Sequence, residues 1–279
     1  MVFGERLADD AISAYAFSAR RTREAPSHYR IIKCLGCGLV RSDGIIPELS
    51  ANSLYRESRY LYQEESAFAA ETYFRLFREV VEMARPGFKV MDVGCGNGSF
   101  LKRLYEDVSC DVTGIEPSRE SLANADPAIQ KRIVQDVFKA DSYDADSFDA
   151  VCAFHLIDHL YSPGEFFDGV LRILRPGGIF LCVCHDVEAW SARLFGEDSG
   201  IFDVEHVYLF DKKTLPALLT KRGFKVERIG SLKNTYPLSY WLRIAPYCNL
   251  LRRCLPRYIV ALPLAIRAGN IFALAKKPG

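Results

Sequence analysis

The segment that most constrains the fold of this chain is a short apolar run that leads into alternating glycines. The run Lys89–Val93 is followed by Gly94, Gly96 and Gly98, and residues 99–106 then have the character of a helix. Glycine permits a tight turn and lets the backbone approach a ligand closely, and a helix N-terminus offers free N–H groups. The pattern predicts a strand–turn–helix unit that binds a ligand at its turn.

Further strand-like and helix-like segments alternate along the chain on both sides of this unit. We predict strands at 89–93, 111–115, 132–135, 148–154, 179–184, 224–229 and 271–275, and helices at 64–84, 99–106, from 118, 164–174 and 214–221. Strands that alternate with helices indicate a parallel sheet covered on both faces. The gap between the last two strands makes residues 235–269 an insertion.

Composition and cysteine usage indicate an ordinary globular chain. Hydrophobic residues make up 49% and charged residues 25%, which excludes disordered, collagen-like and coiled-coil classes. We expect neither a secretory signal in MVFGERLADDAIS nor a transmembrane helix, because no apolar stretch is long enough. Nine cysteines without a regular framework favour a reducing, cytoplasmic compartment.

The glycine spacing separates two families of ligand-binding turn. The dinucleotide fingerprint is G-x-G-x-x-G, whereas this chain has G-x-G-x-G with Asp92 two positions before the first glycine. That segment resembles motif I of class I S-adenosylmethionine-dependent methyltransferases. The resemblance continues, in the family's order, through 114–118 (GIEPS), 135–137 (QDV), 148–151 (FDAV) and 174–179 (LRPGGI).

The chain is therefore similar to the broad ubiquinone-biosynthesis-like group of small-molecule methyltransferases. The resemblance implies a Rossmann-like, doubly wound α/β sheet of seven strands, mostly parallel, with the last strand antiparallel. It also implies S-adenosylmethionine as the cofactor. Its binding residues would be Asp92, Gly94, Cys95, Gly96, Gly98, Glu116, Pro117, Asp136, Val137, Phe154 and His155.

Three acids carry distinct expected roles in that set. Glu116 directly follows the second predicted strand, where a carboxylate can accept hydrogen bonds from a ribose diol. Asp92 would attract the ammonium of the methionine part, and Asp136 would lie near the adenine amine. Plain structural roles stay open: a turn cap for Asp92, a solvated loop acid for Glu116, a helix cap for Asp136 and simple core packing for Phe154.

Methyl transfer from a sulfonium is an in-line displacement that needs alignment of the two reactants and, for a hydroxyl acceptor, one base. The histidines after the fourth and fifth strands are the candidates, and we rank them His206, His159, His155 and then His185. His155 and His159 are four apart, so on a helix they would share a face. The H-E-x-x-H zinc pattern is missing, and we predict no metal site.

The N-terminal extension, residues 1–62, precedes the methyltransferase domain that we assign to 63–279. Its Cys34 and Cys37 resemble the second half of a zinc ribbon. The usual upstream cysteine pair is absent from residues 1–33, so we expect a degenerate knuckle that stabilises a hairpin. Residues 48–62, which are rich in tyrosine, would form a helical lid toward the cofactor.

The charge of the chain is unevenly distributed. The net charge is +1, yet residues 228–279 hold nine Lys or Arg and no acid, which leaves 27 basic against 35 acidic groups before them. In the insertion 235–269 these arginines alternate with aromatic residues. The insertion could be a wall of the acceptor pocket, a peripheral membrane contact or site for a lipid-linked acceptor, or a nucleic-acid surface. We expect no nucleic-acid partner, because no recognition module is visible.

The sequence as a whole predicts methyl transfer from S-adenosylmethionine to a small-molecule or lipid-like acceptor, with oxygen as the expected methylated atom. We expect a cytoplasmic protein, monomeric or homodimeric, with a peripheral membrane location as an open alternative. Three rival functions are a non-catalytic S-adenosylmethionine-binding partner protein, a tRNA-modifying methyltransferase and a nicotinamide-dependent oxidoreductase. The glycine spacing disfavours the last of these.

Overall fold

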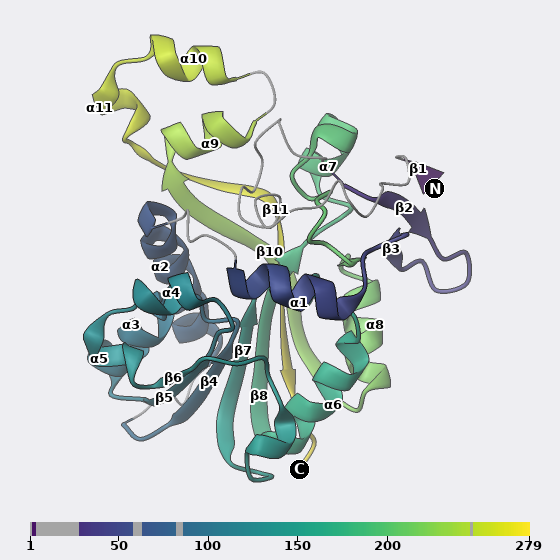
Figure 1. The fold of residues 1–279 in the computed structure, drawn as a ribbon, viewed down its shortest axis with the longest axis vertical. Coiled ribbons are helices and arrows are strands. Elements are labelled where there is room, and N and C mark those ends of the chain that lie inside the picture. The colour runs from purple at the N-terminus through teal and green to yellow at the C-terminus, as the bar shows by residue number, and fades with distance from the viewer. Residues whose placement is uncertain (1, 4–27, 58–62, 82–85, 246–247) are drawn as a thin grey trace.

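A seven-stranded sheet forms the centre of the molecule (Figure 1). The computed structural model describes residues 2–3, 28–57, 63–81, 86–245 and 248–279. The strand order is β10-β11-β8-β7-β4-β5-β6, and β11 is antiparallel to both of its neighbours. The strands are β4 (Lys89–Val93), β5 (Asp111–Ile115), β6 (Ile133–Val134), β7 (Phe148–Phe154), β8 (Leu174–His185), β10 (Lys225–Pro237) and β11 (Pro263–Lys276). The predicted fold, with its antiparallel last strand, is confirmed.

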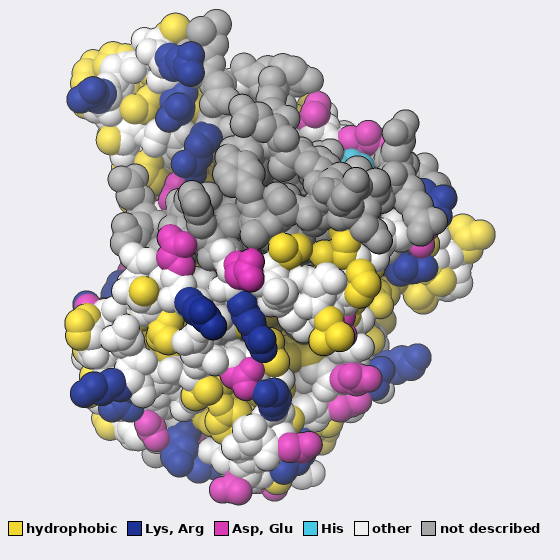
Figure 2. Space-filling model, in the orientation of Figure 1, with side chains coloured by type: hydrophobic (Ala, Val, Ile, Leu, Met, Phe, Trp, Pro, Cys, Tyr) yellow, Lys and Arg dark blue, Asp and Glu magenta, His cyan; other side chains and the backbone are white. Residues whose placement is uncertain are grey.

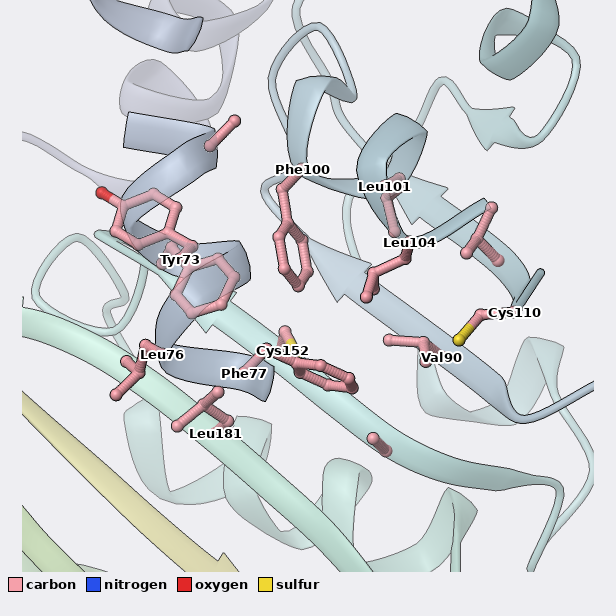
Figure 3. Packing of buried hydrophobic residues seen from close by; sticks show 14 of the residues in the cluster. Tyr73, Leu76, Phe77, Val90, Phe100, Leu101, Leu104, Cys110, Cys152 and Leu181 are labelled. Atoms are coloured by element: carbon pink, nitrogen blue, oxygen red, sulfur yellow. The ribbon is translucent and has the colours of Figure 1, made fainter. Parts of the chain in front are cut away.

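Helices cover both faces of this sheet. The remaining elements of the domain are α2 (Gln63–Val80), α3 (Ser99–Val108), α4 (Arg119–Ala123), α5 (Pro127–Gln130), α6 (Pro163–Ile173), α7 (Trp190–Phe195) and α8 (Thr214–Lys221), with short 3₁₀ helices at Ala140–Ser142 and Gly196–Asp198. One face packs on α2 and α3, where Phe77, Phe100 and Leu104 meet Val90 and Cys152 of the sheet (Figure 3). The other face packs on α6 and α8.

The last two strands extend further than the sequence predicts. The patterns place the end of one strand at 229 and the start of the other at 271, but the strands pair antiparallel as far as Pro237 and Pro263. The polar side chains and prolines of these extensions obscure the strand pattern. The helical part of the insertion is correspondingly shorter, and it comprises α9 (Leu238–Ile244), α10 (Asn249–Cys254) and α11 (Arg257–Val260).

A second, smaller sheet joins the N-terminal region to a late segment of the chain. Its strands, in spatial order, are β1 (Val2–Phe3), β2 (Arg30–Lys33), β3 (Val40–Asp43) and β9 (Tyr208–Leu209). Cys34 and Cys37 occupy the exposed turn between β2 and β3. Hydrogen bonds from Cys37, foremost the one made by its backbone, lower the pKa of the Cys34 thiol.

Helix α1 (Glu48–Glu57) crosses the end of the sheet at which the parallel strands finish (Figure 1). The lid predicted over residues 48–62 stays a prediction, and residues 58–62 lie outside the described residues. Among the described helices, we find none that is long and apolar enough to cross a membrane.

Candidate active site

The turn after β4 is held by backbone geometry that only glycine adopts easily. Gly94, Gly96 and Gly98 have φ values of 75°, 55° and 72°, in the left-handed region that favours glycine. The backbone N–H of Gly94 donates to Ile115 O at 2.8 Å, which ties the turn to the end of β5. A Cβ on Gly98 would lie 2.7 Å from a methyl of Ile129, so the third glycine also permits close packing.

Glu116 joins the glycine turn to the end of β5. One carboxylate oxygen accepts from the backbone N–H of Gly96 at 2.9 Å, and the other accepts from the N–H of Ser118 at 2.8 Å. The residue is 9% exposed and lines the central cavity. Hydrogen bonds to a charged acceptor are stronger than neutral ones. Glu116 therefore fixes the turn at the position where the sequence predicts ligand binding.

Asp92 lies beneath the glycine turn, at the centre of the sheet. It is 2% exposed, and among the described residues its Oδ1 has no hydrogen-bond partner. Burial, with the charge of Glu116 nearby, raises the pKa of the Asp92 carboxyl well above its usual range. A buried carboxyl group without a partner is costly for the fold, which favours a role in binding over a plain turn cap.

We expect Asp92→Asn to stabilise the ligand-free protein at neutral pH. The raised pKa means that the folded chain keeps a proton that the unfolded chain loses near pH 4, so wild-type stability falls as pH rises above that value. The asparagine amide does not titrate, so the variant avoids this loss. We expect its free energy of unfolding to exceed that of the wild type by about 1–3 kcal/mol at pH 8, and the difference to shrink toward pH 4. Thermal denaturation at both pH values measures it, and a lower midpoint for the variant at pH 8 would contradict the assignment.

The other predicted cofactor residues divide into those that line the cavity and those that support it. Gly94, Gly96, Glu116, Pro117, Asp136, Val137, Phe154 and His155 line it, whereas Asp92, Cys95 and Gly98 do not. Asp136 pairs with Lys139 at 2.6 Å and accepts from the N–H of Val137. Phe154 stacks on Tyr73 at 4.3 Å between ring centroids. Phe154 thus packs in the core and also faces the cavity.

The cavity has a volume of about 1370 Å³ and runs from the glycine turn to the insertion. Pockets for one small molecule typically measure ~300–1,000 Å³, so this one has room for two ligands. The far end is lined by Tyr236, Tyr240 and Trp241 from β10 and α9, and Tyr236 and Tyr240 stack at 4.1 Å. Tyr55 from α1 also lines the cavity.

Buried histidines meet around Asp158 between the two ends of the cavity. His185 and Asp158 are in contact at 2.6 Å between Nδ1 and Oδ2. Burial alone would raise the pKa of the Asp158 carboxyl, but the nearby histidines, His159 most strongly, and the hydrogen bond from His185 hold it well below its usual range. An ionised Asp158 can only accept, so Nδ1 of His185 is the donor in this contact.

His206, which the sequence ranks first as a base, lies behind this group. It is 4% exposed and is not among the residues that line the cavity. Its Nδ1 contacts Ile201 O at 2.7 Å, and its ring lies 4.4 Å from that of His185 and 4.9 Å from that of His159. Burial lowers the pKa of His206 well below its usual range. This position suits a residue that supports the rings facing the cavity.

His155 and His159, by contrast, line the cavity. His155 has a left-handed backbone with φ 52°, which is a strained conformation for a residue with a side chain. Nδ1 of His159 contacts the hydroxyl of Tyr55 at 2.8 Å, which joins α1 to the cluster. His185, ranked last, also lines the cavity.

The histidine cluster contains groups with the composition of a metal site. The ligand atoms of His155, Asp158 and His185 lie within 4.8 Å of one another, as do those of Asp158, His159 and His206. Two ligands of one tetrahedral zinc ion are roughly 3.3 Å apart when each bond is about 2.0 Å. The 2.6 Å contact between His185 and Asp158 is instead a hydrogen-bond length. His185 and Asp158 are therefore hydrogen-bonded to each other in this structure, and the absence of a metal site stays a prediction.

Sequence reasoning did not identify Asp158, Asn234 or Asn270 as site residues. Asp158 comes shortly after β7, and its only signal is its place between two histidines. Asn234 and Asn270 lie on the paired strands β10 and β11, and both line the cavity. Neither has a local signal, because they are 36 residues apart and meet only through the strand pairing.

Comparison with known proteins gives a consistent result. Residues 62–229 match a family described as "Methyltransferase domain". The chain is 30% identical over 187 residues to the ubiquinone biosynthesis O-methyltransferase of Psychrobacter cryohalolentis, covering 59% of this chain and 70% of that protein. It is 28% identical over 172 residues to the human mitochondrial ubiquinone biosynthesis O-methyltransferase, covering 56% of this chain but only 46% of the human protein. The chain thus spans about half the length of the human relative.

Solved structures share the fold at low sequence identity. A SAM-dependent methyltransferase from Archaeoglobus fulgidus superimposes with a TM-score of 0.54 at 18% identity, over 78% of this chain and 100% of that one. A putative methyltransferase from Bacillus halodurans gives 0.53 at 16% identity, over 74% and 99%.

Proposed function

This chain belongs to the methyltransferase-domain family, and from that membership we propose that it transfers a methyl group from S-adenosylmethionine to a hydroxyl oxygen of a small or lipid-like acceptor. The observation that carries the proposal is one cavity that reaches both the glycine turn with Glu116 and the Asp158–His185 pair. The O-methyltransferase relatives from Psychrobacter and human support oxygen as the methylated atom.

The glycine-turn end of the cavity fits S-adenosylmethionine. Gly94 and Gly96 line it, and a Cβ on Gly96 would project into open space where a ligand can approach the backbone. We propose that Glu116 binds the ribose hydroxyls, that Asp136 lies near the adenine and that Asp92, ionised when the ammonium is bound, attracts it through water. Once bound, S-adenosylmethionine supplies an electrophilic methyl group on sulfur.

We propose His185 as the base that removes the acceptor proton. Asp158 accepts the Nδ1 proton of His185, which leaves Nε2 with a lone pair on a side chain that lines the cavity. The acceptor oxygen keeps the electron pair of its O–H bond, and the proton moves to Nε2. The imidazolium that results is stabilised by the Asp158 carboxylate, as in other carboxylate–histidine pairs.

The direct test incubates the purified protein with S-adenosylmethionine carrying a labelled methyl group and a panel of hydroxylated aromatic compounds, amines and tRNA. Label transfer to a hydroxyl oxygen, located by mass spectrometry, is the expected result. Binding of S-adenosylmethionine without transfer would favour a non-catalytic partner protein, and transfer to tRNA or to nitrogen would replace the proposal with another acceptor class.

We further propose that the insertion contacts a membrane surface from which a lipid-like acceptor could enter. Large apolar side chains are exposed on and beside α11, with Tyr258 at 74% and Leu262 at 58%. Arg252, Arg253 and Arg257 are exposed among them. Figure 2 shows these basic and hydrophobic groups side by side over α9–α11. Such a mixture suits anionic headgroups above an apolar layer.

Charge reversal at the insertion is expected to weaken vesicle binding. Each Lys or Arg near an anionic bilayer contributes about 1 kcal/mol, so Arg252→Glu with Arg253→Glu should reduce binding by about tenfold or more. Co-sedimentation with phosphatidylcholine vesicles containing phosphatidylserine measures it. The matched control reverses two exposed lysines elsewhere, Lys131 and Lys221. Equal losses in the two double variants would show a general charge effect and contradict the insertion as the contact.

A further inference from the structure

Asn234 is a buried residue at the wall of the cavity, and the donor group of its amide has no partner among the described residues. It is 3% exposed, lines the cavity and has no hydrogen-bond partner for Nδ2 among the described residues. Its Oδ1 is satisfied, because it accepts from Nδ2 of Asn270 at 3.1 Å. Buried polar groups are almost always hydrogen-bonded in folded proteins. An unpaired buried donor at a ligand cavity therefore indicates a group that pairs when ligand is bound.

The irregular pairing of β10 with β11 places this amide at the cavity. Leu232 pairs with Asn270, but Asn234 pairs with Ile266, so the register shifts between them and residues 267–269 bulge out. The bulge is anchored, since Gly269 O accepts from the N–H of Asp186 at 2.7 Å. Bulges commonly occur beside active sites, where they redirect side chains. The anchored bulge thus determines how Asn234 and Asn270 lie relative to each other on the two strands.

Asn270 fixes the orientation of the Asn234 amide. Its Nδ2 lies 3.1 Å from Asn234 Oδ1 and 3.2 Å from His155 Nε2, so one NH₂ group can donate to two acceptors. Flipping the Asn234 amide alone, so that its oxygen and nitrogen change places, would set two NH₂ groups against each other. Asn270 also pairs with His185 across β11 and β8. The amide of Asn234 is thus linked through Asn270 to His155 and to the strand position of His185, the proposed base.

We propose that Asn234 is an acceptor-binding residue, whose side-chain N–H groups donate to a second oxygen of the methyl acceptor while the reacting hydroxyl lies at His185. The inference rests on the proposed function for the place of the reacting hydroxyl. The ligand class is a hydroxyl compound with a further hydroxyl or carbonyl oxygen close by. Asn234 lies outside residues 62–229, which match the family, so this contact belongs to a part of the chain that the match does not cover.

The first test needs no acceptor. Replacing Asn234 by Leu removes an unpaired buried donor together with the oxygen that accepts from Asn270, whose NH₂ group keeps His155 Nε2 as an acceptor, so we expect a thermal midpoint close to that of the wild type. An asparagine that serves the fold alone would lower the midpoint on replacement. Asn124→Leu is the matched control, because Asn124 donates to Glu120 O at an exposed helix end. A midpoint for Asn234→Leu several degrees below the wild type would contradict the proposal.

The second test measures discrimination between two probes that differ by one oxygen. Calorimetry with S-adenosylhomocysteine present compares catechol with phenol. The wild type and Asn124→Leu should prefer catechol by about five- to tenfold, the worth of one hydrogen bond. Asn234→Leu should lose that preference. Asn234→Asp should also lose the preference for catechol, because its side chain has the same volume but no amide N–H. This variant therefore tests the proposal even if the leucine variant does not fold.

Two results would overturn the proposal: retention of the preference in both Asn234 variants, or equal affinity for the probes in the wild type, including no binding of either. Label transfer from S-adenosylmethionine is measured on the same samples. A lasting preference for catechol without any transfer would refute the proposed function and leave the Asn234 contact standing. Transfer with no preference would refute the contact alone.

Discussion

Glu116→Gln is expected to weaken the binding of S-adenosylhomocysteine by roughly 10- to 150-fold. In the wild type both carboxylate oxygens accept backbone N–H groups, one from Gly96 and one from Ser118. A glutamine side chain has only one oxygen, so its NH₂ group must face one of those donors. The loss of one hydrogen bond to a charged acceptor is worth about 1.5–3 kcal/mol, which supports the size of the effect.

Isothermal titration calorimetry measures this binding directly, without a methyl acceptor. Glu120→Gln is the matched control, because Glu120 is an exposed acid a little further along, in the first turn of α4. We expect its dissociation constant to stay within about twofold of the wild-type value, as for most surface substitutions. If Glu116→Gln bound S-adenosylhomocysteine as tightly as Glu120→Gln, the donor site would have to lie elsewhere in the cavity.

His185→Gln is expected to lower kcat for methyl transfer by about 10²–10⁴-fold, the usual contribution of a positioned base. The glutamine keeps a polar side chain that can still contact Asp158, but it has no basic nitrogen. KM should change little, since the base acts on the proton and not on the rest of the acceptor. The measurement uses labelled S-adenosylmethionine with the hydroxyl acceptor that the panel identifies.

Two further variants distinguish a role of His185 as the base from a role in packing alone. His28 is also buried, yet it is not among the residues that line the cavity, so His28→Gln should keep its turnover. His185→Gly should regain part of its activity when imidazole is added, because a free imidazole can replace the missing ring. Full turnover by His185→Gln would contradict the assignment of His185 as the base. So would a failure of imidazole to rescue His185→Gly, if His28→Gln also lost as much activity as His185→Gln.

The central sheet was predictable because each of its strands has a local signal. Phe148–Phe154 is apolar except for Asp149, as expected for a strand buried on both faces. The extensions of β10 and β11, and the strand β9 of the smaller sheet, lack such signals. The short strand β9 owes its existence to pairing with β3, and no local pattern reports a contact between residues as distant in the chain as Arg41 and Tyr208.

The donor end of the site was more predictable than the acceptor end for a related reason. The turn at Gly94–Gly98 and Glu116 lie on consecutive strand–helix units, so spacing along the chain reports their proximity in space. The acceptor end combines Asp158, His185 and Asn234 from three distant parts of the chain. Spacing along the chain could identify histidines as candidates there, but only the fold shows that the buried carboxylate of Asp158 contacts the ring of His185.

The place of β11 in the sheet has a consequence for biosynthesis. Among the strands of this sheet it is synthesised last, yet it lies between β10 and β8 and hydrogen-bonds to both. Until residue 276 has emerged from the ribosome, a nascent chain exposes the unpaired edges of both neighbours. Such edges are prone to pair with other chains. The sheet therefore closes only after all of its other strands have been made.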